Sequence, residues 1–212
     1  MWKLLGQLLE GTVVSLEVFT LTLVFAIPLA LPVALGRMSR NPFVRAPVNL
    51  YIQVMRGTPL ILQIIFVYFA PYYVLGLSWG EHRLAAVIVA FAVNYAAYFA
   101  EIYRGGIQSI PKGQWEAAKV LGFTRADAFF RVIVPQVVKR ILPASANEVI
   151  TLVKDTALAQ VVGLAELFRV AQNASARQFS TTPIFVAGAF YFVMNWVVSE
   201  FFVRWERRLE YY

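Results

Sequence analysis

The sequence has no cysteine, a single histidine and few charged residues. The missing cysteines exclude disulfides, thiolate metal sites and a cysteine nucleophile, and His82 alone offers little for a metal centre or a catalytic triad. Only 15% of the 212 residues are charged, whereas soluble domains average about 25%. With 59% hydrophobic residues, the chain lacks the polar side chains that a water-facing surface needs. Composition therefore excludes a soluble enzyme and favours a membrane protein.

Five stretches are long and apolar enough to be membrane-spanning helices, each of which needs about 20 residues. They cover residues 12–36, 47–75, 84–103, 141–163 and 184–203. A cleavable signal peptide is the alternative at the N-terminus, but the apolar run that follows Lys3 and Glu10 is long for that role. We predict an all-α, polytopic membrane protein with five transmembrane helices in a single domain, residues 1–212.

The basic residues predict the orientation of this domain. Of 19 Lys and Arg residues, thirteen lie in one set of loops, residues 37–45, 104–140 and 204–208. Cytoplasmic loops of membrane proteins carry an excess of Lys and Arg. We therefore expect the N-terminus outside and the C-terminus in the cytoplasm. The net charge of +7 then reflects topology and does not indicate a nucleic-acid partner.

The largest basic loop, residues 104–140, has helical features of its own. Residues 116–121 are mostly good helix formers, and Gly122 suits the left-handed residue that ends a helix. Thr124 and Asp127 have the spacing of a capping box, and Pro135 restricts the residue before it. This predicts two short helices with a bend at Gly122, the second ending near Pro135. The residues alone leave open a docking element or an amphipathic hairpin on lipid headgroups.

The loop resembles the EAA motif of ABC-importer permeases, which reads Glu-Ala-Ala, three residues, Gly, nine residues and Ile-x-Leu-Pro. The residues in register are Glu116, Ala117, Ala118, Gly122 and Pro135, with Val132 and Val134 at the Ile and Leu positions. Other stretches are similar to the polar amino acid permease subfamily: residues 56–60 with Gln63, 101–107 with 109–111, 147–148, and 154–158. Ala157 departs from that pattern, where Ser is common. The resemblance extends over residues 12–208.

The resemblance implies a transport subunit in a bacterial or archaeal cell (inner) membrane. It would move polar amino acids into the cytoplasm by alternating access. The implied partners are a cytoplasmic ATP-binding-cassette ATPase, a second permease subunit (homo- or heterodimer) and an extracytoplasmic solute-binding protein. The implied ATPase-coupling residues are Glu116, Ala117, Ala118 and Gly122. The chain has no Gly-x-x-x-x-Gly-Lys-Ser/Thr loop, so we expect no enzyme activity, with ATP and magnesium on the partner and no cofactor or metal here.

Ionisable residues inside spans are costly and usually face a protein interior or a water-filled cavity. The candidates for substrate binding are Asp155, Glu101, Asn94, Tyr98, Gln63 and Glu148. In the functional interpretation, the three acids attract the α-amino group or cationic side chain of an amino acid, which suits a cationic substrate. In the structural interpretation, Asp155 and Glu101 pair with Arg56, Lys154 or Arg104 and hold the helices together.

Two other classes of function remain open from the residues. An ion-gradient-driven secondary transporter would use Asp155 and Glu101 as a relay and would not need the 104–140 loop. A membrane scaffold would use its polar residues only to join helices.

Overall fold

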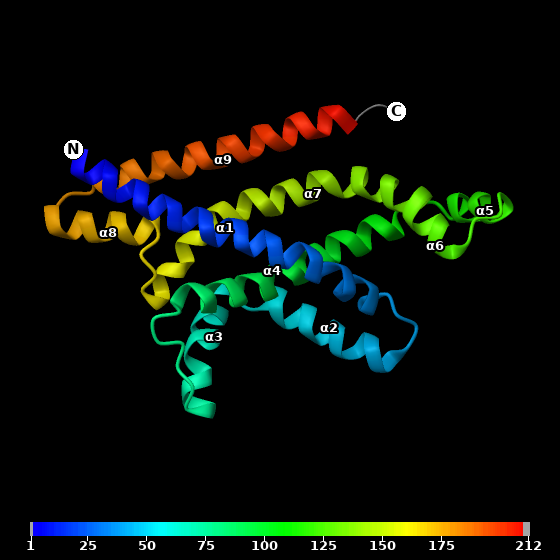
Figure 1. The fold of residues 1–212 in the computed structure, drawn as a ribbon, viewed down its shortest axis with the longest axis horizontal. Helices are drawn as coiled ribbons and strands as arrows, with labels where there is room; N and C mark the ends of the chain where they lie inside the picture. The colour runs from blue at the N-terminus through cyan, green and yellow to red at the C-terminus, as the bar shows by residue number, and fades with distance from the viewer. Residues whose placement is uncertain (1, 210–212) are drawn as a thin grey trace.

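The computed structural model describes residues 2–209, and this part of the chain consists of helices joined by short loops, without strands (Figure 1). The long helices are α1 (Trp2–Arg37), α4 (Arg83–Gln108), α7 (Val134–Asp155) and α9 (Thr182–Leu209). Shorter ones are α2 (Pro42–Gly57), α3 (Leu60–Leu75), α5 (Lys112–Val120), α6 (Arg125–Asp127) and α8 (Leu167–Gln178). A π-helix, η1 (Ala128–Ile133), precedes α7, and a 3-10 helix, η2 (Thr156–Val162), follows it.

The core lies where α1 crosses α4 and α7. The buried face of α1 carries a row of small residues, Ala26, Ala30 and Ala34, spaced by four so that they share one face. Small residues let helix backbones approach closely, which is how membrane helices gain packing energy. Against them pack the large buried rings of α4, including Phe91 and Phe99. Helices α4 and α7 therefore hold fixed positions next to α1.

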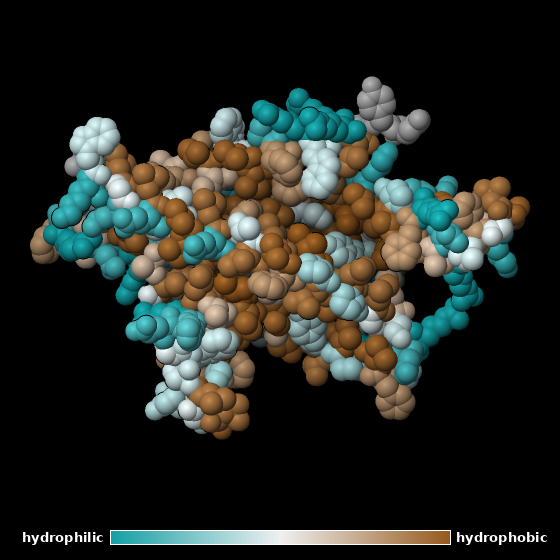
Figure 2. Space-filling view, viewed as in Figure 1, coloured by the Kyte–Doolittle hydropathy of each residue, from teal (hydrophilic) through white to brown (hydrophobic). Residues whose placement is uncertain are grey.

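Within residues 2–209, three helices are long and apolar enough to cross a membrane: α1, α4 and α9. The pair α2 and α3 passes the same test jointly but is bent by 112°, which makes it a broken span or a re-entrant segment. Apolar side chains cover the middle of the molecule, and polar ones gather at both ends (Figure 2). The α-helical membrane fold is confirmed, while the count of five spans stays a prediction.

The bend between α2 and α3 lies at Thr58 and Pro59, inside the predicted second span. Pro59 lacks an N–H and stands in the extended region (φ −61°, ψ 133°), so the first helix ends before it. From there α3 begins against α4 and η2, and its C-terminal end projects beyond the other helices (Figure 1). The sequence marks this break, and the two helices meet there at 112°, so whether residues 47–75 form one broken span stays a prediction.

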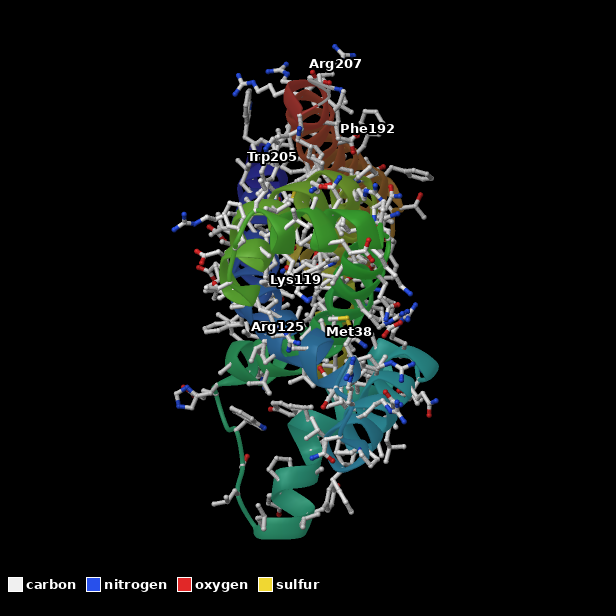
Figure 3. The ribbon with its side chains drawn as sticks, turned by 90° about the vertical axis from the view of Figure 1, so that its right-hand side faces the viewer. Met38, Lys119, Arg125, Phe192, Trp205 and Arg207 are labelled. Carbon is white, nitrogen blue, oxygen red and sulfur yellow. The ribbon has the colours of Figure 1, made fainter. Side chains whose placement is uncertain are left out.

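The three basic segments predicted to share one side do lie together. The C-terminal ends of α1 and α9 and the whole α5–α6 region gather at one end of the molecule (Figure 1), which we call the basic end. Figure 3 looks at this end, where Met38, Lys119, Arg125 and Arg207 are labelled.

The loop after Gly122 differs from the prediction. We expected its second helix to stop near Pro135, but helical structure continues without a break from Arg125 to Asp155. The π-helix makes this possible, because its wider turn sits where the proline ring would clash with the preceding turn. One helical rod of about 45 Å therefore joins the basic end to Asp155.

Gly106 keeps α4 close to α7, and we expect Gly106→Ala to destabilise the fold. An added Cβ would lie 2.2 Å from Ile141 Cγ2 and 3.1 Å from Val137 Cγ1, both on β-branched side chains of α7. Overpacking of this kind costs about 1–3 kcal/mol. Thermal unfolding of the purified protein in detergent measures the loss. Gly105→Ala is the matched control, since its Cβ meets nothing within 4 Å; equal stability of the two variants would contradict the close approach.

Candidate functional site

Asp155 is held by a tyrosine from a neighbouring helix. It is the last residue of α7, and its Oδ2 accepts a hydrogen bond of 2.7 Å from the hydroxyl of Tyr95 on α4. Tyr95 is 2% exposed, and Asp155 is half-buried. Glu148 lies on the same face of α7, two turns earlier, and is half-buried as well. We call Asp155, Tyr95 and Glu148 the Asp155 cluster.

Glu101 lies in a second cluster. It follows Tyr95 by six residues on α4 and is therefore nearer to the basic end of the molecule. Its carboxylate is bound in a bidentate manner by Arg104, at 2.8 and 3.0 Å. Arg37 of α1 approaches at 3.4 Å and Arg56 of α2 at 3.8 Å. These four residues form the Glu101 cluster, which joins three helices and carries two more positive than negative charges.

The three arginines change which acids contribute negative potential to the site. The pairing of Glu101 with Arg104 and Arg56 was one of the two interpretations of the sequence; Arg37 was not anticipated. Because three arginines surround Glu101, it adds no negative potential, and any negative bias rests on Glu148 and Asp155. The structure favours a structural role for Glu101, and its contact with substrate stays a prediction.

An aromatic pair links the two clusters. The rings of Tyr95 and Tyr98 have centroids 6.1 Å apart, and the Arg56 guanidinium lies 5.2 Å from the centre of the Tyr98 ring. A cation over a tyrosine face is attracted by the ring quadrupole. Tyr98, a predicted substrate residue, is thus placed between the Asp155 cluster and Arg56.

Asn94 and Gln63 lie at the bend between α2 and α3. The side-chain nitrogen of Asn94 donates to the Met55 carbonyl and to Gln63 Oε1, each at 2.9 Å. Gln63 Nε2 in turn donates to the Met55 carbonyl at 3.0 Å and to Thr58 Oγ1 at 2.8 Å. Backbone carbonyls freed by a helix break need such partners in lipid. These amides support the bend, and their contact with substrate stays a prediction.

The predicted coupling segment has the expected geometry at Gly122. This residue has a φ of +78°, and α5 ends just before it. Beyond it, Thr124 Oγ1 accepts from the Asp127 amide at 3.1 Å, as the capping prediction requires. Glu116, Ala117 and Gly122 are exposed, but Ala118 is 2% exposed and packs within its own subunit. Because neighbouring helix residues point about 100° apart, only Ala117 of the two alanines is open to a partner, and its docking role stays a prediction.

The loop is fixed to the rod that carries Asp155. The rings of Trp115 in α5 and Phe129 in η1 stack with centroids 6.4 Å apart. Gln136 Nε2 of α7 donates to Gln114 Oε1 at 3.1 Å. Both contacts join α5 to the start of this rod, one through η1 and one through α7.

Glu166 is a buried acid that the sequence analysis missed. It caps α8, accepting from the amides of Phe168 at 2.7 Å and Arg169 at 2.6 Å, and Tyr191 of α9 donates to it at 3.0 Å. Burial raises the pKa of this carboxyl, while these donors act against the rise. Its position carries no strong sequence signal, because Ser, Thr, Asp and Asn are the residues that mark a helix N-cap. Tyr95 carries no such signal either, because aromatic residues are common in spans.

We expect Glu101→Gln to destabilise the protein by about 1–2 kcal/mol, because three arginines lose their common counter-ion. Breaking a fully buried pair costs about 3–5 kcal/mol, and partial exposure of these arginines reduces the effect. Thermal unfolding in detergent measures it. The control is Glu200→Gln, which breaks the exposed Glu200–Arg204 pair of α9 and should cost less than about 1 kcal/mol. Equal costs would mean that the Glu101 cluster does not hold the helices.

Comparison with known proteins places the chain among transport permeases. Residues 26–211 match the family model described as binding-protein-dependent transport system inner membrane component. The chain is 36% identical to the octopine transport system permease protein OccM of Rhizobium radiobacter, covering 95% of this chain and 85% of that protein. It is 35% identical to the arginine transport system permease protein ArtQ of Bacillus subtilis, covering 96% and 92%. The L-cystine transport system permease protein TcyB of the same species is 36% identical, covering 100% and 92%.

Solved structures agree with this placement. A crystal structure of an amino acid ABC transporter with histidines contains a chain that matches with a TM-score of 0.89 and 35% identity, over 98% of this chain and 96% of that one. A methionine ABC transporter in an inward-facing conformation matches with a TM-score of 0.74 at 19% identity, over 99% and 97%, which shows the fold alone. The chain therefore belongs to the family of binding-protein-dependent inner membrane transport components, in which it is a permease subunit and not the ATPase.

Proposed function

We propose that this chain is the membrane subunit of an ATP-binding-cassette importer that moves polar amino acids, with a preference for cationic ones, into the cytoplasm. The relatives named above as permeases for octopine, arginine and cystine support an amino acid substrate. The observation that carries the cationic preference is the Asp155 cluster, in which two acids share one face of α7 and one of them is held by Tyr95. The basic end is then cytoplasmic, with the C-terminus there and the N-terminus outside.

The coupling route follows from the rod between Arg125 and Asp155. An ATPase that closes beneath the basic end pushes on α5 through the exposed surface at Glu116, Ala117 and Gly122. The contacts of Trp115 and Gln114 pass this movement to η1 and α7. Because Asp155 ends the same rod, docking and substrate release are joined by one helical element. A second permease subunit completes the pathway, and an external binding protein delivers the amino acid.

Reconstitution tests the proposal. The permease is purified with its ATPase, placed in proteoliposomes and supplied with ATP and the solute-binding protein. We expect uptake of labelled arginine to require all three components, and arginine or lysine to raise the thermal unfolding temperature of the complex more than glutamine does. Uptake by this chain alone, driven by a proton or sodium gradient, would instead establish the secondary transporter. Equal stabilisation by arginine and glutamine would reject the cationic preference.

A further inference from the structure

The segment around Asp155 changes its helical form at this residue. Helix α7 ends at Asp155, and the 3-10 helix η2 begins with the next residue. At the far end of η2, Gly163 adopts a φ of +78°, and its carbonyl accepts from Arg83 Nη1 at 3.1 Å. A switch from α to 3-10 geometry within a helical stretch weakens the local hydrogen bonding. The backbone alone therefore holds the Asp155 carboxylate less firmly than the interior of α7 would.

Tyr95 supplies the missing support from outside that segment. Its hydroxyl donates to Asp155 Oδ2 at 2.7 Å across sixty residues of sequence. Its ring is 2% exposed and lies parallel to that of Phe91, with centroids 6.3 Å apart and planes 5° apart, and it also contacts Phe99. A ring packed in this way presents its hydroxyl at a fixed place. The acid therefore stands where the helical form changes, and a rigid donor from another helix anchors it.

We propose that Tyr95 is a positioning residue for Asp155 and thereby a determinant of substrate selectivity. The bond engages Oδ2 and fixes the plane of the carboxylate. Recognition of a guanidinium or ammonium group depends on that plane, because charge-assisted hydrogen bonds are directional and bidentate ones especially so. A neutral side chain gains nothing from this alignment. The inference rests on the proposed function, in which Asp155 contacts the substrate.

Tyr95→Phe tests the inference, since it removes one oxygen and keeps the packed ring. In the reconstituted complex we expect the KM for arginine to rise about tenfold, which is the low end for losing a hydrogen bond to a charged group. The kcat should stay within about twofold of the wild-type value and the KM for glutamine within about threefold, because only the affinity for the cationic side chain is reduced. The control is Tyr103→Phe on the same helix, whose hydroxyl donates weakly to the Ile27 carbonyl at 3.4 Å. It should leave both KM values unchanged.

A double-mutant cycle with Asp155→Asn separates this inference from the proposed function. We expect Tyr95→Phe to have no further effect on the ratio of the arginine KM to the glutamine KM once Asp155 is replaced. An unchanged ratio in Tyr95→Phe, with a shifted ratio in Asp155→Asn, overturns the role of Tyr95 and leaves the proposed function intact. A shift from Tyr95→Phe that persists in the Asn background overturns positioning as its cause. If neither variant shifts the ratio, the contact between Asp155 and substrate fails.

Asp155→Glu provides a second route that leaves Tyr95 intact, in case Tyr95→Phe does not assemble. It keeps the charge and moves the carboxylate by one methylene, away from the position that Tyr95 fixes. We expect the KM for arginine to rise at least about threefold, with assembly checked by thermal unfolding and arginine binding by the shift in unfolding temperature. Wild-type selectivity in this variant would show that carboxylate position does not matter, which overturns the proposal.

Discussion

Asp155→Asn should reduce arginine uptake by about tenfold or more while changing glutamine uptake by less than about threefold. The substitution keeps the size and shape of the side chain, and the Tyr95 hydroxyl can still donate to the amide oxygen, as it does to Oδ2 in the structure. Only the charge is lost. Hydrogen bonds to charged groups are worth about 1.5–3 kcal/mol, against about 1 kcal/mol for neutral ones. Every 1.4 kcal/mol is a factor of ten, so the difference appears in the ratio of the two uptake rates.

The chain offers one matched control for this change. Asp127, the other aspartate, lies in the 104–140 loop, where it caps α6 with Thr124 and pairs with Arg131 at 3.3 Å. Asp127→Asn can weaken coupling to the ATPase, but such a defect slows both substrates alike. The ratio of arginine to glutamine uptake should therefore stay at its wild-type value. If Asp155→Asn also lowers both rates equally, Asp155 does not select for a cationic side chain, and the charge-selectivity proposal is rejected.

Periodic, strongly apolar segments were predictable from the sequence, because local composition alone decides them. The first, third and fifth predicted spans correspond to α1, α4 and α9, although each helix is longer at one or both ends. The shape of the second predicted span was not predictable from the sequence. Thr58 and Pro59 mark where the helix breaks, but the angle depends on Asn94 and Gln63, which bind the freed carbonyls from another part of the chain.

The candidate site shows the same division between local and distant contacts. The pairing of Glu101 with Arg104 follows from a spacing of three on one helix. Arg37 comes from α1, sixty-four residues away, and reaches Glu101 only because the C-terminal ends of α1 and α4 meet. The bond between Tyr95 and Asp155 is likewise a product of tertiary packing. The sequence therefore identifies the charged residues within the spans. Which of them remain unneutralised and able to bind a substrate depends on the partners that tertiary packing brings to them.

Gly122→Asp should leave the permease folded in the membrane and separate ATP hydrolysis from transport. Gly122 follows α5 with a φ of +78° and is exposed, and a Cβ added there would meet no other atom within 4 Å. An aspartate can occupy this backbone conformation at a cost of about 1–2 kcal/mol, so the fold survives. Its side chain and charge then stand where the ATPase must approach Glu116 and Ala117. We expect uptake to fall at least about tenfold while ATPase activity in the proteoliposomes persists, since a weakened contact of about 1.4 kcal/mol suffices.

Gly80→Asp separates docking from backbone strain. Gly80 also has a positive φ, +54°, is exposed and has open space around its Cβ position, but it lies in the loop between α3 and α4, away from the basic end. The Gly80→Asp variant therefore has the same kind of backbone strain and the same added charge as Gly122→Asp, at a place that the ATPase does not contact. Uptake by Gly80→Asp should stay within about twofold of wild type, because a solvated surface charge has little effect on stability. Equal loss in the two variants would trace the defect to the glycine backbone, and tightly coupled transport by Gly122→Asp would remove α5 from the docking surface.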